Sequence, residues 1–78
     1  MKEMKREERY SDTEFYLNEE KNRRVAITEC NQEIGHKQMY SVRVIEVDEN
    51  GNCRSGETVA TRCTHSQAMA IAREYYFK

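Results

Sequence analysis

The chain has three cysteines and two histidines, residue types that can ligate zinc, and a cysteine can also act as a nucleophile. Cys63 and His65 flank Thr64 just ahead of a helix-start signal, and a helix N-terminus stabilises a thiolate. Zinc is bound by four such ligands, usually in close pairs such as Cys-x2-Cys, and no pair here has that spacing. We therefore expect Cys30 and Cys63 to be small buried residues at strand ends and Cys53 to lie in a loop, with no metal site and no cofactor. A small metal or thiol protein centred on Cys63 and His65 is the third-ranked hypothesis.

Sequence motifs for catalysis are also missing from the chain. It contains no G-x-x-x-x-G-K-[ST], no G-x-G-x-x-G and no H-E-x-x-H. A nucleophilic enzyme needs a base and an oxyanion site beside its nucleophile, in a pocket that excludes water. A chain of 78 residues has little room for such a pocket. We expect a protein that is not an enzyme and has no catalytic residues.

Arginines on predicted neighbouring strands could instead form a basic sheet face that binds nucleic acid. Acidic residues lie on the same elements, and 13 Lys and Arg against 14 Asp and Glu leave a net charge of −1. That balance does not favour a nonspecific DNA binder, so nucleic-acid binding is the second hypothesis. Its candidate residues are Arg23, Arg24, Arg43, Arg54 and Arg62.

Protein binding is favoured by bulky aromatic side chains, which are too many for one helix on a small sheet to bury. Acidic residues also cluster, and an acidic patch on a small domain can occupy a partner's phosphate-binding surface. Tyr16 and Tyr76 are the aromatic interface candidates because they lie off the regular apolar faces. The candidate partner-binding residues are Asp12, Glu14, Tyr16, Glu19, Glu20, Asp48, Glu49 and Tyr76.

Three segments with alternating apolar residues predict the strands that must position these side chains. They cover residues 24–30, 39–48 and 56–63. Asn50-Gly51 predicts a tight hairpin turn between the second and third of them. The alternation slips after Val44, which indicates a bulge or a strand covered on both faces.

A C-terminal helix is the element that the sequence predicts most sharply. Thr64-His-Ser-Gln67 has the T-x-x-Q form of a capping box. The residues after it form one apolar helical stripe, while Arg73 and Glu74 point outward. The stripe consists of Ala68, Ile71, Ala72 and Tyr75.

The N-terminal third is more ambiguous. Residues 1–9 are almost all charged, so we expect a disordered or frayed leader ahead of a single α+β domain at 10–78. Ser11-Asp-Thr-Glu14 has the capping-box form and favours a short helix over residues 12–20. An edge strand at 14–18 competes with it. The expected fold is a three-stranded antiparallel β-meander packed by the C-terminal α-helix, with this short N-terminal helix or edge strand.

Composition limits the remaining possibilities. With 37% hydrophobic and 35% charged residues, the core must be small, and a homodimer that buries more apolar surface would add stability. Three cysteines without a secretory signal indicate a reducing compartment, so we expect a cytoplasmic protein. No apolar run approaches the roughly 20 residues of a membrane span, so no membrane association is expected.

Three stretches resemble small phage or mobile-element inhibitors, including anti-CRISPR proteins built from a small antiparallel sheet and one helix. They are YSVRVIEVDENGN at 40–52, TRC at 61–63 and THSQAMAIAR at 64–73. The likeness covers about two-thirds of the chain, from Arg23 onward, and is one of size, charge and topology. Anti-CRISPR families share no active-site signature, so no functional residue is transferred.

The resemblance implies a stoichiometric inhibitor that binds a CRISPR-Cas complex and blocks nucleic-acid recognition or nuclease recruitment. The leading hypothesis is accordingly a non-enzymatic interaction protein whose partner is a host protein or nucleoprotein complex. The same meander also resembles small DNA-binding domains of integrases and excisionase-like factors. That likeness supports the second hypothesis.

Overall fold

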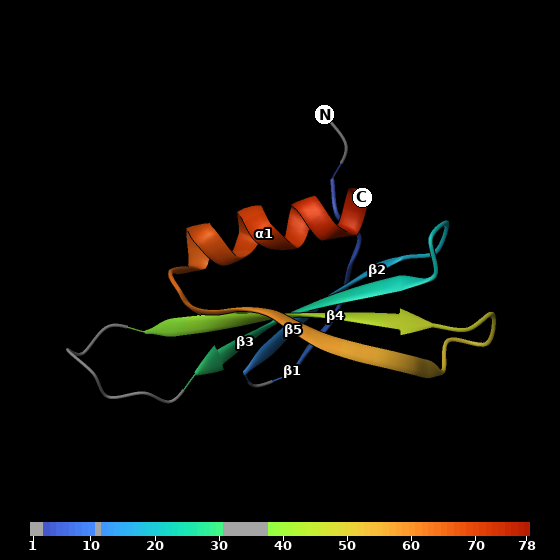
Figure 1. Ribbon diagram of the computed structural model, residues 1–78, viewed down its shortest axis with the longest axis horizontal. Coiled ribbons are helices and arrows are strands. Elements are labelled where there is room, and N and C mark those ends of the chain that lie inside the picture. Colours follow the sequence, from blue (N-terminus) through green and yellow to red (C-terminus); the bar gives the residue numbers. More distant parts are fainter. Residues whose placement is uncertain (1–2, 11, 31–37) are drawn as a thin grey trace.

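Strands in chain order form one antiparallel sheet, and a single helix crosses one of its faces (Figure 1). The computed structural model describes residues 3–10, 12–30 and 38–78. The sheet contains five strands in the order β1-β2-β3-β4-β5 among these residues. The elements are β1 Arg6–Tyr10, β2 Thr13–Asn18, β3 Arg23–Cys30, β4 Met39–Val47, β5 Cys53–Cys63 and α1 His65–Phe77.

The α+β class, the antiparallel sheet and the C-terminal helix are confirmed, but the expected number of three strands is wrong. The two further strands, β1 and β2, come from the segment ahead of Arg23. Residues 14–18 form a strand, extended by one residue to Thr13, and not the helix, but this strand lies between β1 and β3 and not at the sheet edge. Consecutive apolar residues suit a strand because successive side chains point to opposite faces. Tyr16 faces the helix-side core, while Phe15 and Leu17 face the other side. Ser11, which began the predicted capping box, lies outside the described residues.

β1 comes from the charged segment that was expected to be frayed. It pairs with β2 in a register that shifts between Arg6 and Arg9. Charged side chains in this strand find partners far along the chain: Glu7 accepts hydrogen bonds from the guanidinium of Arg24. Met4, just ahead of the strand, packs against the core. These contacts offset the conformational entropy that β1 loses on becoming ordered, which its own charged sequence could not offset.

The hydrophobic core lies between α1 and the central strands. Val25 and Val42 are fully buried and Ile27 is 1% exposed. On the helix, Ala68 and Ala72 are also fully buried, because their small side chains let α1 lie close to the sheet. The predicted helix cap is confirmed in full, with both hydrogen bonds of the capping box formed.

The hairpin between β4 and β5 turns where Asn50-Gly51 predicted it. Gly51 has φ +84°, a conformation that glycine adopts without strain. The β4–β5 register shifts between Val42 and Arg43, ahead of the predicted slip, whereas the pairing from Arg43 to Glu46 is regular across Val44 and Ile45. Further shifts occur nearer both ends of the pair, and Arg62 has φ +54°. Among the described residues, no helix has the length and apolar character that crossing a membrane requires.

Candidate binding face

The face of the sheet opposite α1 carries no helix in the described part of the chain (Figure 1). We call it the uncovered face. Strand registers arrange its side chains in rows that cross the sheet from β2 to β5. Two adjacent rows are Phe15–Ala26–Arg43–Thr58 and Leu17–Arg24–Ile45–Gly56.

A shallow groove of about 520 Å³ runs along the β1–β2 side of this face. Tyr10 stands at one end of it, and Phe15 and Leu17 contribute its apolar lining. Tyr10 is 58% exposed and is the exposed large hydrophobic residue of the described chain. Its ring meets that of Phe15 edge-on, with centroids 5.4 Å apart. The groove therefore presents an aromatic pair and a leucine to solvent.

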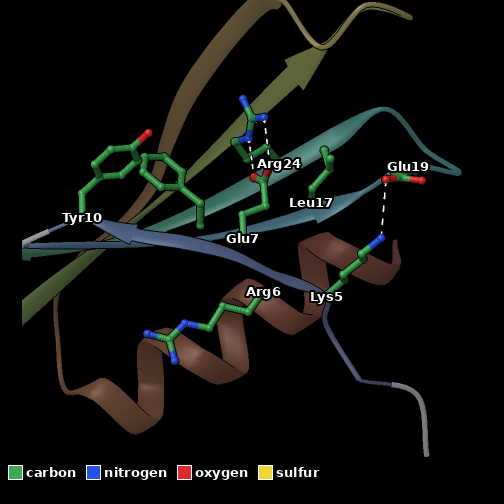
Figure 2. Close-up of a pocket in the computed structure, with 8 residues that line it drawn as sticks. Lys5, Arg6, Glu7, Tyr10, Leu17, Glu19 and Arg24 are labelled. Atoms are coloured by element: carbon green, nitrogen blue, oxygen red, sulfur yellow. Dashed lines mark hydrogen bonds and ion pairs between the residues drawn. The ribbon is translucent and has the colours of Figure 1, made fainter.

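Two ion pairs cross the groove (Figure 2). Arg24 donates from Nε to Glu7 Oε1 at 2.7 Å and from Nη2 to Glu7 Oε2 at 3.2 Å. The hydrogen bond to Glu7 is the main cause that raises the pKa of Arg24, so this two-point pair stabilises the charged form of the guanidinium. Lys5 and Glu19 form a looser pair of 3.6 Å nearer the other end. Four of the five charged residues that line the groove therefore pair within it, and the fifth, Arg6, approaches Glu14 outside the groove lining.

Arg43 differs from these groups because it forms no ion pair with any described residue. Its guanidinium lies against the backbone of Gly56 on β5. A Cβ atom at Gly56 would lie 2.7 Å from Nη2 and 2.8 Å from Nε of Arg43. Glycine is therefore required at this position for the guanidinium to approach the strand so closely.

The five arginines of the nucleic-acid hypothesis are not brought together. Arg23 lies on the helix side, where it bonds Glu46 at 3.0 Å and the carbonyl of Tyr75 at 2.8 Å. Arg24 and Arg43 share the uncovered face. The other two lie at separate positions on β5: Arg54 lines a hollow beside the β4–β5 turn, and Arg62 is exposed at the bulge near the strand's end. A continuous basic surface does not form from this set.

The predicted acidic residues divide between the two ends of the sheet. Glu19 and Glu20 follow β2, and Asp48 and Glu49 follow β4. These strands run in the same direction, so both acidic turns lie at one end (Figure 1). A hydrogen bond of 2.9 Å from the Val47 amide to the carbonyl of Asn22 joins the two hairpins there.

Asp12 and Glu14 lie at the opposite end, beside the start of α1. Glu14 Oε2 is 3.3 Å from Nε2 of His65 and accepts a hydrogen bond from the Tyr16 hydroxyl at 3.2 Å. Arg6 approaches the same carboxylate at 3.9 Å. Glu14 is thus occupied by contacts within the fold.

Asp48 acts on its own turn. Its Oδ1 accepts hydrogen bonds from the backbone amides of Asn50 and Asn52, both at 2.9 Å. The bond from Asn52 is the main cause that lowers the pKa of Asp48. This carboxylate therefore stabilises the hairpin that Asn50-Gly51 begins.

Tyr16 and Tyr76 were predicted to face a partner, and the structure corrects this placement. Tyr16 is 7% exposed and Tyr76 is 5% exposed, both within the core. The Tyr76 hydroxyl donates to the carbonyl of Leu17 at 2.8 Å and accepts from the amide of Lys5 at 3.0 Å. A polar tip satisfied in this way allows the ring to be buried.

Cys63 and His65 do not form a joint site. Cys63 is 7% exposed, and its thiol donates to the carbonyl of Thr61 at 3.4 Å. His65 contacts Glu14 instead, and its ring lies edge-on to Tyr40 with centroids 5.0 Å apart. No group of three or more His, Cys, Asp or Glu side chains that could hold a metal ion occurs within residues 3–10, 12–30 and 38–78. His36, a further candidate ligand by type, lies outside these ranges.

Sequence reasoning missed the roles of Glu7, Phe15, Leu17 and Gly56. Alternation within residues 13–18 was a signal for two of them, because a strand there places Phe15 and Leu17 on one face. Glu7 and Gly56 gave no local signal, since each acts on a residue of another strand. Comparisons of the chain with known protein families, curated proteins and solved structures found no match.

Proposed function

We propose that this chain is a non-enzymatic binding protein that engages a partner protein through the uncovered face of its sheet. The observation that carries the proposal is the exposed ring of Tyr10 beside Phe15 and Leu17, at a groove on the face without a helix. Aromatic residues in partly enclosed surface positions commonly supply most of the energy of a protein interface.

Charge supports a protein partner over nucleic acid for this face. Glu7 and Glu19 line the groove, and each is already matched by a cation. Phosphate groups would meet these carboxylates, whereas an apolar protein segment gains from Tyr10 and Phe15. The dispersed arginines supply no competing surface.

The specific form of the proposal follows the resemblance to phage inhibitors. We propose that the partner is a host protein or nucleoprotein complex in the cytoplasm, a CRISPR-Cas effector being the first to test. A domain of 9.3 kDa seated on an effector would act by steric or electrostatic blockade of nucleic-acid recognition or nuclease recruitment.

The test compares the full chain with a double variant, Tyr10→Thr and Phe15→Thr, which keeps residues suited to strands. Glu74→Gln, on the exposed side of α1, is the matched control. Each protein is mixed with purified effector complexes and is also used to capture partners from nuclease-treated lysate. Urea midpoints confirm that all three are folded.

We expect the original chain and the control to capture the same protein, and the double variant to lose it by about tenfold or more. Equal capture by the double variant would show that the uncovered face is not the binding surface. Unchanged DNA binding and cleavage by the effectors would exclude the inhibitor form while leaving other protein partners to be identified by mass spectrometry.

A further inference from the structure

We propose that the uncovered face recognises a partner segment that places a carboxylate on Arg43 and apolar side chains on the neighbouring rows. This inference rests on the proposed function and names the chemistry of the partner. It comes from the position of Arg43 and from the balance of charge around it.

The guanidinium of Arg43 lies over the backbone of Gly56 on β5. Glycine leaves room for this approach, because a Cβ atom at position 56 would lie 2.7 Å from Nη2 and 2.8 Å from Nε. The Arg43 side chain is exposed, so a group on a partner can reach the guanidinium directly. A planar guanidinium also matches a carboxylate with two hydrogen bonds.

On this face, one positive charge is left without a described acidic partner. Arg24 is matched by Glu7, and Lys5 by Glu19. The two rows contain two cations, Arg24 and Arg43, and of these Arg43 forms no ion pair with a described acid. The complementary group is therefore an anion supplied by the partner.

The surroundings of Arg43 favour a carboxylate on a protein over the other candidates. Phe15 belongs to its own row and Ile45 is next to it on the adjacent row, and both are partly exposed, so an apolar residue beside the acid finds apolar surface. A second copy docked through the same face would bring a second unmatched Arg43, while Glu7 and Glu19 of that face are already paired with Arg24 and Lys5. Nucleic acid would place phosphates near the carboxylates of the groove.

A random-peptide display selection on the immobilised full chain supplies the probe. Selected peptides are synthesised and their affinities measured by calorimetry against the original chain and three variants. Arg43→Gln removes the charge, and Gly56→Ala keeps the charge while displacing the guanidinium. Arg54→Gln removes one positive charge from the hairpin end and is the matched control.

We expect the selected peptides to share an Asp or Glu next to aromatic or aliphatic residues. Their affinity should fall about tenfold or more for Arg43→Gln, fall measurably for Gly56→Ala and stay within about twofold for Arg54→Gln, as for the loss of one charge-assisted hydrogen-bonded pair. Peptides without an acid, or equal affinity for Arg43→Gln, would overturn the inference.

Further outcomes separate this inference from the proposed function. If the double variant Tyr10→Thr with Phe15→Thr abolishes peptide binding but Arg43→Gln does not, the role of the carboxylate is refuted while the uncovered face remains the binding surface. Binding that survives in both variants would refute both proposals. Arg43-dependent binding of a 20-nucleotide single strand, or a dimer in sedimentation that closes this face, would overturn the inference in favour of that occupant.

Discussion

Replacing Tyr76 with phenylalanine should loosen β1 while leaving the helix and the central strands in place. The Tyr76 hydroxyl bridges the carbonyl of Leu17 on β2 and the amide of Lys5 just ahead of β1. The Leu17 amide donates directly to the Lys5 carbonyl at 3.0 Å beside this bridge. A hydroxyl from the helix thus completes the strand pairing where β1 and β2 begin to separate.

The magnitude follows from the two hydrogen bonds. Each contributes a net of about 0.5–1.5 kcal/mol, so Tyr76→Phe should lower the free energy of unfolding by about 1–3 kcal/mol. The ring stays in its place, and no cavity term is added. For a domain of this size, each kcal/mol corresponds to a fall in Tm of roughly 4–8 °C.

Urea unfolding and amide hydrogen exchange of the full chain measure the two parts of this prediction. Exchange at the Lys5 amide should accelerate far more than at Ile27 in the core, because the former loses its acceptor. Tyr75→Phe is the matched control, since the hydroxyl of Tyr75, the preceding residue, makes no hydrogen bond with a described residue. A Tyr76→Phe protein within about 0.5 kcal/mol of the original, with unchanged Lys5 exchange, would refute the bridging role.

Three further perturbations test other parts of the fold by urea unfolding. Thr64→Ala removes the side-chain acceptor of the Gln67 amide and should destabilise the protein by about 1 kcal/mol, with Ser66→Ala on the exposed first turn as control. Ile27→Ala empties a position that is 1% exposed and should destabilise it by about 2–5 kcal/mol; a value below about 1 kcal/mol would contradict the core assignment. The hydrogen bond from the Asn52 amide lowers the pKa of Asp48 below its ordinary 3.8. The ionised carboxylate therefore contributes its full stabilisation of the folded state above pH 3.8, and this stabilisation is lost as the pH falls through the lower pKa of the folded state. The stability gap between the original chain and Asp48→Asn should therefore narrow from about pH 5 to about pH 2, and a constant gap would contradict this cause.

The elements that could be predicted from sequence are those specified by neighbouring residues. The capping box at Thr64 and Gln67 forms both of its hydrogen bonds, because each partner lies within one turn of the other. Asn50-Gly51 likewise gives a turn by its own backbone preferences. In these places local chemistry and tertiary structure agree.

β1 could not be predicted because its order depends on distant groups. Glu7 and its partner Arg24 are separated by 17 positions, and Lys5 and Tyr76 by 71. A window of sequence around β1 contains charge without an apolar face, the pattern of a disordered segment. Its partners become visible only when the sheet and the helix are assembled.

The orientation of the helix end was missed for a related reason. The predicted stripe continued from Ala72 to Tyr75, whereas the structure buries Tyr76, one turn beyond Ala72, and leaves Tyr75 half-buried. Either tyrosine fits helical periodicity, since residues three and four apart share a face. The choice is made by the Leu17 carbonyl and the Lys5 amide, which satisfy the Tyr76 hydroxyl.

The end of α1 explains why the two faces of the sheet differ in what they leave unsatisfied. Side chains from β2, β3 and the turn between them bond its last carbonyls: Asn18 bonds that of Tyr76 at 2.7 Å, and Arg23 that of Tyr75 at 2.8 Å. These hydrogen bonds satisfy carbonyl groups that a helix C-terminus leaves without partners. On the helix side, the side chains of Asn18 and Arg23 are therefore hydrogen-bonded within the fold. On the uncovered face, by contrast, the ring of Tyr10 stays in solvent and Arg43 meets no described acid. A surface that retains an apolar ring and an unmatched cation, in a fold that satisfies such groups elsewhere, is the surface where a partner gains most by binding.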